Sequence, residues 1–237
     1  MPKMTLSIVS LIGANLVPVV GVIGFGWDAA TIVLLYWTEN VILGGYNVLK
    51  MALLMPRNPM EHLGKLFMIP FFSVHFGGFC AVHGFFLIAL FGIGGGLHGA
   101  HDIFPTAVGP LVFLDLLARV VGRLWGSLSP GMEWAVLGLV GSHGVSLVQN
   151  YILGKEYAAA SLKDLMVQPY GRIVLLHVTI IAGAAPMIMF GSPVPLLCIL
   201  IGLKIVVDVW SHVRSHRKLQ KGPPAPGPQT PPAESAA

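Results

Sequence analysis

Six long apolar segments, separated by short polar stretches, dominate this chain of 237 residues. A helix needs about 20 apolar residues to cross the hydrocarbon core of a bilayer. The segments that reach this length are residues 5–25, 29–54, 66–92, 131–153, 172–190 and 194–213. Only 10% of the residues are charged, whereas a soluble domain usually carries about 25%. The pattern therefore predicts an all-α membrane protein, built as a helical bundle.

A seventh segment, residues 103–125, is amphipathic and not uniformly apolar. Its charged residues Asp115, Arg119 and Arg123 recur at every fourth position and form a stripe along one helix face. This pattern is typical of a helix that lies in the membrane interface or re-enters the bilayer. We therefore predict six transmembrane helices plus one interfacial amphipathic or re-entrant helix. Seven transmembrane helices are the alternative.

The distribution of basic residues favours the six-helix topology. If residues 103–125 do not cross, eleven of the 14 Lys and Arg fall on one side, and only Arg119 and Arg123 fall on the other. If they do cross, the loops at 55–65 and 154–172 fall on opposite sides. The positive-inside rule then places both termini in the cytoplasm. Because the net charge of +4 is gathered at segment ends, it does not indicate a nucleic-acid partner.

The chain is expected to form one transmembrane domain over residues 1–218. Residues 219–237 are rich in proline and alanine, and such a composition predicts a disordered tail. Cys80 and Cys198 both lie in apolar segments without metal-ligand spacing. We interpret them as small core residues.

Glu39 lies in Tyr36-Trp37-Thr38-Glu39-Asn40, deep inside the apolar segment 29–54. A carboxylate at that depth costs at least ~2.5–3.5 kcal/mol on insertion scales, so we expect it to have a partner. Tyr36, Asn40, Gly44 and Asn47 recur at helical spacing beside it. These residues predict a polar seam, with Gly44 and Gly45 allowing another helix to approach closely.

Other polar side chains fall at a depth similar to that of Glu39. A count along each segment gives one candidate set of metal ligands: Glu39, His75, His143, His177 and Asp208. Imidazole and carboxylate groups are ligands for zinc or another divalent metal. The leading hypothesis is an intramembrane metal site, which binds the metal or uses it to act on a lipid.

The last apolar segment carries Lys204, Asp208 and His212 at every fourth position. Lys204 and Asp208 have the spacing of an ion pair on one helix. Alternatively, this face points toward Glu39 or a histidine across the bundle.

Two further functions remain open. The same residues are suited to a proton- or ion-coupled carrier, in which they act as a relay, or they simply lock the helices of a structural subunit together. The sequence does not decide whether the protein is an enzyme. The expected ligands are a lipid or a small ion. His83 is expected to join the histidines of the glycine-rich loop, His98 and His101, which could line an entrance.

The Tyr36-Trp37-Thr38-Glu39-Asn40 element, together with His75 and the Lys204/Asp208/His212 face, resembles an uncharacterised bacterial family of integral membrane proteins. The resemblance covers most of residues 1–218. It implies a helical bundle in the bacterial inner membrane and no established activity. His212 and His216 are also similar to the His-x-x-x-His of the seven-span zinc hydrolases, a family that includes alkaline ceramidases. The spacing of serine and histidine that this family has in an early helix is missing here.

Overall fold

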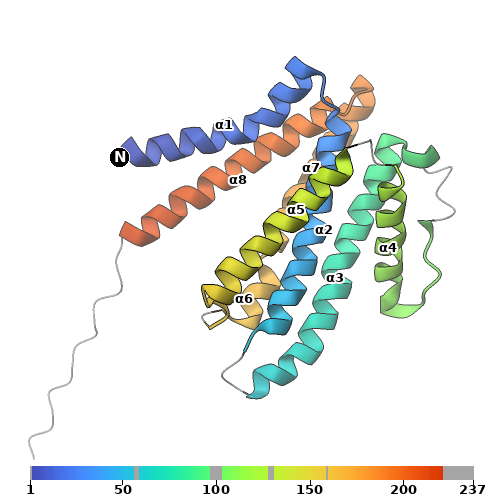
Figure 1. Cartoon of the computed structure of the whole chain (residues 1–237). Coiled ribbons are helices and arrows are strands. Elements are labelled where there is room, and N and C mark those ends of the chain that lie inside the picture. The colour runs from blue at the N-terminus through green and yellow to red at the C-terminus, as the bar shows by residue number, and fades with distance from the viewer. Residues whose placement is uncertain (1, 56–58, 97–102, 128–130, 159, 221–237) are drawn as a thin grey trace, which may run out of the picture.

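The structure is a computed structural model of the chain, and it describes residues 2–55, 59–96, 103–127, 131–158 and 160–220. For the outer parts of the first and last helices it describes the backbone alone, so the side chain of His212 lies outside the described residues. Every regular element in the described ranges is a helix, which agrees with the predicted all-α class (Figure 1). The tail beyond Gln220 and the loop with His98 and His101 also lie outside these ranges.

The main elements are α-helices, all of them long except α6 (Figure 1). Their bounds are α1 Pro2–Phe25, α2 Ala29–Leu53, α3 Pro59–Phe91, α4 Val112–Trp125, α5 Met132–Ser146, α6 Leu162–Val167, α7 Tyr170–Phe190 and α8 Val194–Gln220. Shorter helices are η1 Ile93–Gly95, η3 Gly109–Leu111 and η5 Glu156–Ala158, and α5 continues as a π-helix, η4 Leu147–Leu153.

Three described helical stretches are long and apolar enough to cross a membrane, namely His62–Phe91, Met132–Leu153 and Leu162–Phe190. Large apolar side chains also cover much of the outer surface. Ile23, Leu66 and Phe190, for example, are 73%, 75% and 72% exposed. Apolar surface of this extent is typical of a face that meets lipid or another protein.

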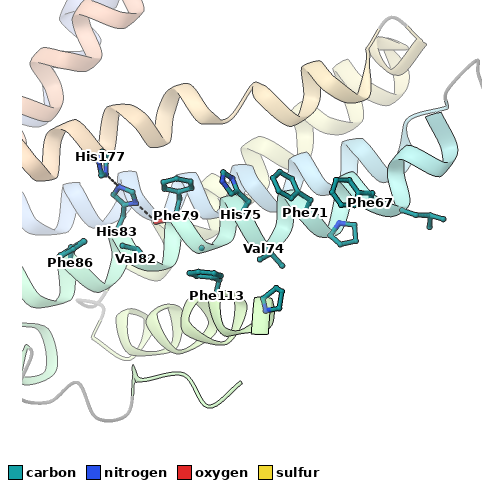
Figure 2. A pocket seen from close by; sticks show the side chains of 14 residues that line it. Phe67, Phe71, Val74, His75, Phe79, Val82, His83, Phe86, Phe113 and His177 are labelled. Atoms are coloured by element: carbon teal, nitrogen blue, oxygen red, sulfur yellow. Dashed lines mark hydrogen bonds between the residues drawn. The ribbon is translucent and has the colours of Figure 1, made fainter. Parts of the chain in front are cut away.

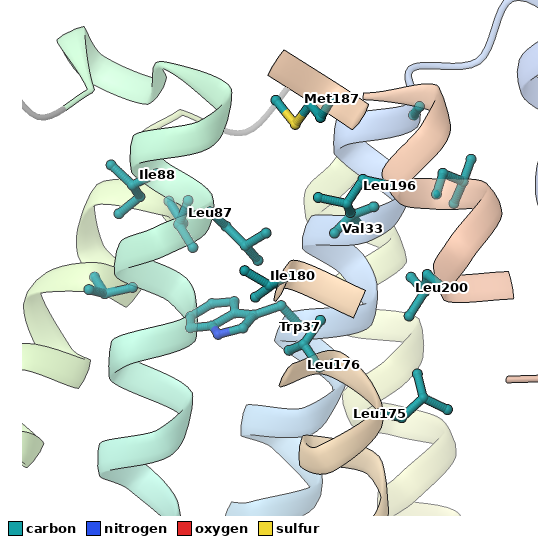
Figure 3. Packing of buried hydrophobic residues seen from close by; sticks show 14 of the residues in the cluster. Val33, Trp37, Leu87, Ile88, Leu175, Leu176, Ile180, Met187, Leu196 and Leu200 are labelled. Carbon is teal, nitrogen blue, oxygen red and sulfur yellow. The ribbon is translucent and has the colours of Figure 1, made fainter. Parts of the chain in front are cut away.

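Helix α2 is the central element of the bundle. It begins at Asp28, whose side chain accepts hydrogen bonds from the backbone N–H groups of Ala30 (3.2 Å) and Thr31 (3.0 Å), as an N-cap does. The indole of Trp37 is buried among α2, α3 and α7 (Figure 3), and its Nε1 donates to the carbonyl of Cys80 (2.8 Å). This bond satisfies the polar atom of an otherwise apolar core.

Side-chain contacts fix the relative direction of the helices. Trp37 of α2 meets Cys80 of α3, while Lys65 of α3 donates to the carbonyls of Ala52 (3.0 Å) and Leu54 at the other end of α2. These two helices are therefore antiparallel. We call the end of the bundle where α2 terminates the Lys50 end, and the end where α3 terminates the Phe91 end.

Helix α4 runs parallel to α3 and terminates at the same end. Phe113, near its start, packs against Gly78 in the middle of α3, and Arg123, near its finish, donates to the carbonyl of Gly94 just beyond α3 (2.9 Å). Helix α4 therefore begins at mid-height of α3 and finishes at the Phe91 end. The predicted amphipathic helix is confirmed over Val112–Trp125, with Asp115 and Arg119 paired at 2.8 Å.

Candidate functional site

Glu39 has a charged partner, as its depth in the apolar segment predicted. The Nη2 of Arg172, in the first turn of α7, donates to Glu39 Oε2. The other oxygen, Oε1, lies 3.4 Å from Nε2 of His143 on α5. Both side chains are mostly buried, with 21% of Glu39 and 34% of Arg172 exposed. Three helices are therefore joined at one carboxylate, which we call the Glu39 cluster.

The rest of the predicted polar seam lies around this cluster. The guanidinium of Arg172 lies over the ring of Tyr36, 5.2 Å from its centroid, at a distance suited to a cation–π contact. Asn40 is 1% exposed and donates from Nδ2 to the carbonyl of Tyr36 (2.8 Å). Asn40 Oδ1 and Arg172 Nε are buried atoms for which the described residues supply no hydrogen-bond partner. Two buried polar atoms of this seam, one acceptor and one donor, are thus left unused.

Arg172 reaches the level of Glu39 because the short helix α6 folds back into the bundle. Asn47 of α2 donates from Nδ2 to the carbonyl of Leu165 in α6 (2.6 Å). Leu165 and Leu162 are buried in a core cluster with residues of α2 and α3. Helix α7 consequently starts beside the middle of α2. The sequence predicts Arg172 at the polar boundary of the apolar segment 172–190, and no local signal in the sequence marks this fold-back.

A polar cavity of about 340 Å³ adjoins the cluster on its Lys50 side. It lies between α2, α5 and the turn that joins α6 to α7, and its polar lining consists of Tyr46, Asn47, Lys50, His143, Ser146, Gln168 and Arg172. None of the described residues that line it is acidic. Lys50 and Arg172 therefore give the cavity a positive lining, which favours an anionic occupant.

The remaining candidate ligands lie in other parts of the bundle. Nδ1 of His75 is 2.7 Å from the hydroxyl of Tyr170, and Nδ1 of His177 is 2.8 Å from Nε2 of His83. Asp208 accepts a hydrogen bond from Nδ2 of Asn15 on α1 (3.1 Å).

Helix α8 therefore uses its carboxylate to hold α1. No ion pair between Lys204 and Asp208 is found among the described residues. Lys204 is half-buried on the same helix.

Of the five candidate ligands, the structure brings together Glu39 and His143 only. Within the described ranges, no three His, Cys, Asp or Glu side chains form a group that could hold a metal ion. Arg172 also occupies one oxygen of Glu39, so a cation bound there would lie against a fixed positive charge. The metal site stays a prediction, with Glu39 and His143 as its two neighbouring donors.

The expected partners of His83, His98 and His101 of the glycine-rich loop, lie outside the described residues. His83 is 2% exposed and bonds to His177 of α7. The two histidines meet because α3 and α7 run parallel here, with His75 beside Tyr170 and His83 beside His177. The similar spacings of these pairs, eight residues on α3 and seven on α7, are a sequence signal that could have paired them.

Comparison with family models shows to which protein family this chain belongs. The model of a family of unknown function, DUF6498, matches residues 2–225. The chain belongs to this family. The match agrees with the expected uncharacterised family and covers every described helix. No curated protein and no solved structure matches the chain.

Proposed function

We propose that this protein crosses a bacterial membrane six times, with α4 re-entrant, and is a proton-coupled carrier for a small anion such as a carboxylate or phosphate. The observation that supports the proposal is that Arg172 belongs both to the Glu39 cluster and to the lining of the polar cavity. Its guanidinium is bonded to Glu39 and also lines the polar cavity. An anion in the cavity and the Glu39 carboxylate therefore compete for one guanidinium.

This competition links the anion to a proton. With Glu39 ionised, Arg172 is held by its carboxylate, and an incoming anion also meets the negative charge of Glu39. Protonation of Glu39 removes that charge and frees the guanidinium for bidentate hydrogen bonding to the ligand. Anion binding then favours proton uptake, and proton uptake favours anion binding to the same extent. Affinity for the anion should therefore rise as the pH falls.

Other ionisable groups near Glu39 and the cavity also influence anion binding. His143 lies against the second oxygen of Glu39 and also lines the cavity. Asp208 of α8 is near enough to act electrostatically on Tyr36, which lies against Arg172. Lys50 lies in the cavity lining and supplies a second cation. The dependence on Glu39 must therefore be separated from that of His143 by substitution.

The test is calorimetric titration of the purified protein in nanodiscs of phosphatidylcholine with succinate and with inorganic phosphate. At least one probe is expected to bind about tenfold or more tightly at pH 5.5 than at pH 7.5. Glu39→Gln should bind tightly at both pH values, and His143→Gln should keep the dependence on pH. Lys163→Gln is the matched control, because Lys163 is an exposed cation at the same end that does not line the cavity.

Two results would overturn the proposal. The first is that neither probe binds the folded protein at either pH, even in nanodiscs that contain no anionic lipid. The second is an unchanged dependence on pH in Glu39→Gln. Binding that disappears when phosphatidylglycerol is added would identify a lipid headgroup as a competitor for the cavity and would support an anionic site.

A further inference from the structure

A second cavity lies on the other side of α3, separate from the polar cavity and nearly free of polar atoms. It is a groove of about 630 Å³ between α3, the start of α4 and one residue of α7, His177 (Figure 2). No residue is shared between its lining and that of the polar cavity. Its volume is in the range of sites that bind small molecules, about 300–1,000 Å³.

One wall of the groove is a ladder of rings on α3, formed by Phe67, Phe71, His75, Phe79 and His83 (Figure 2). The rings recur at every fourth residue, and adjacent ring centroids are 5.8, 5.2, 5.1 and 6.3 Å apart. At 1.5 Å per residue the ladder is about 24 Å long. A long apolar molecule that lies along the helix is the shape that fills such a groove.

The polar end of the groove has a fixed hydrogen-bonding character. Nδ1 of His83 is 2.5 Å from the carbonyl oxygen of Phe79. Because a carbonyl oxygen only accepts, this nitrogen must carry the hydrogen. In the neutral ring Nε2 of His83 is then an acceptor, and its partner at 2.8 Å, Nδ1 of His177, must donate to it.

The same reasoning assigns the protonation of Nε2 of His177, the last nitrogen in this series of hydrogen bonds. With its hydrogen on Nδ1, the neutral ring of His177 has an unprotonated Nε2. No described residue is recorded as a hydrogen-bond partner of this atom, and the side chain is exposed in the groove lining. His75 differs, because the Tyr170 hydroxyl beside it can either donate or accept. His177 is therefore the position at which the groove presents a defined acceptor.

We propose that this groove binds a lipid alcohol, a long apolar molecule whose single hydroxyl donates to Nε2 of His177. The hydrocarbon lies along the ladder toward Phe67, where the wall is fully apolar. A methyl ether of the same length cannot donate a hydrogen bond and loses this interaction. A carboxylate is also disfavoured, since it is ionised, lacks a donor and has no cation among the described lining residues.

The test compares two photoreactive probes, a diazirine-labelled C18 alcohol and its methyl ether, on the full chain in phosphatidylcholine nanodiscs. The alcohol is expected to crosslink to the lining residues of the groove and to be displaced by unlabelled C18 alcohol at about tenfold lower concentration than by the unlabelled ether. His177→Phe preserves a ring but removes the acceptor, and it should abolish the difference between alcohol and ether. Ile181→Ala is the control, because Ile181 is a 66% exposed residue of α7 outside the groove.

Equal displacement by alcohol and ether in the unmodified protein would overturn the proposal and assign the groove to ordinary acyl chains. Crosslinks distributed over the outer faces of α7 and α8 would overturn it as well. Neither measurement depends on the folding of a variant. The proposal also stands apart from the polar cavity, since anion binding and alcohol binding use different residues.

Discussion

Arg172 is the residue on which the Glu39 cluster depends. A carboxylate inside an apolar bundle is costly, and the ion pair with Arg172 offsets part of this cost. The guanidinium-bearing side chain of Arg172 also lines the polar cavity. A lysine could not take this position equally well, because it lacks the planar fork and the flat face that lies on Tyr36. At the scale of the residue, the properties of the site therefore depend on the partner of Glu39 being an arginine.

Asp115 organises the turn before α4 and gives a prediction that depends on pH. Its Oδ2 accepts from the backbone N–H groups of Thr106 (2.7 Å) and Ala107 (2.9 Å). The bond from Ala107, then those from Arg119 and Thr106, lower the pKa of this carboxyl from 3.8 to about 2. A lowered pKa means that the stabilisation is complete above pH 3.8 and is lost as the pH falls through about 2.

Asp115→Asn is therefore expected to lower the midpoint of thermal unfolding by a few degrees at pH 7. The difference from the unmodified protein should shrink as the pH falls from 4 to 2, because the stabilisation by the ionised carboxyl is progressively lost toward its pKa of about 2. Thermal unfolding in detergent, followed by circular dichroism, measures this. A difference that is as large at pH 2 as at pH 7 would contradict the assignment.

At the scale of elements, the helices approach one another at glycines. Gly44 of α2 faces Phe76 of α3, and a Cβ built on Gly44 would lie 2.6 Å from that ring. Gly45 is exposed and a Cβ there meets nothing within 4 Å. Sequence analysis expected both glycines to permit a close approach. The structure supports Gly44 alone, because successive positions on a helix point in different directions.

Gly44→Ala is expected to destabilise the bundle by roughly 1–3 kcal/mol, since the buried ring of Phe76 must move to admit the methyl group. Gly45→Ala is the matched control and should be neutral or slightly stabilising, because alanine is the better helix former. Unfolding of both variants in mixed micelles of dodecylmaltoside and sodium dodecyl sulfate gives the two free energies. Equal effects of the two substitutions would show that the α2–α3 contact does not require Gly44.

At the scale of the whole molecule, the position of α4 is the feature that bears on the proposed topology. Because α4 begins beside Gly78 and finishes near Gly94, the chain returns to the end it left. Lys50, Lys65, Lys155 and Lys163 lie at the opposite end of the bundle, the Lys50 end. In the proposed topology this basic end faces the cytoplasm.

Single cysteines on a background without Cys80 and Cys198 test this topology. A membrane-impermeant maleimide is expected to label Ser127→Cys in intact cells and Glu156→Cys only after lysis. Both positions are exposed in the structure. With seven transmembrane helices the pattern would be reversed, and Glu156→Cys would be labelled from outside.

The sequence by itself determined three features: the helical class, the amphipathic character of the segment that forms α4, and the need of Glu39 for a partner. These features depend on hydropathy, periodicity and the cost of burying charge, which are properties of local sequence. Which partner Glu39 receives was decided by the tertiary structure alone, and so was the separation of His75, His177 and Asp208 into different contacts. A count of residues along each segment assumes that helices start at the same level. The fold-back of α6 shifts α7 along α2, and this shift places Arg172, not a third metal ligand, against Glu39.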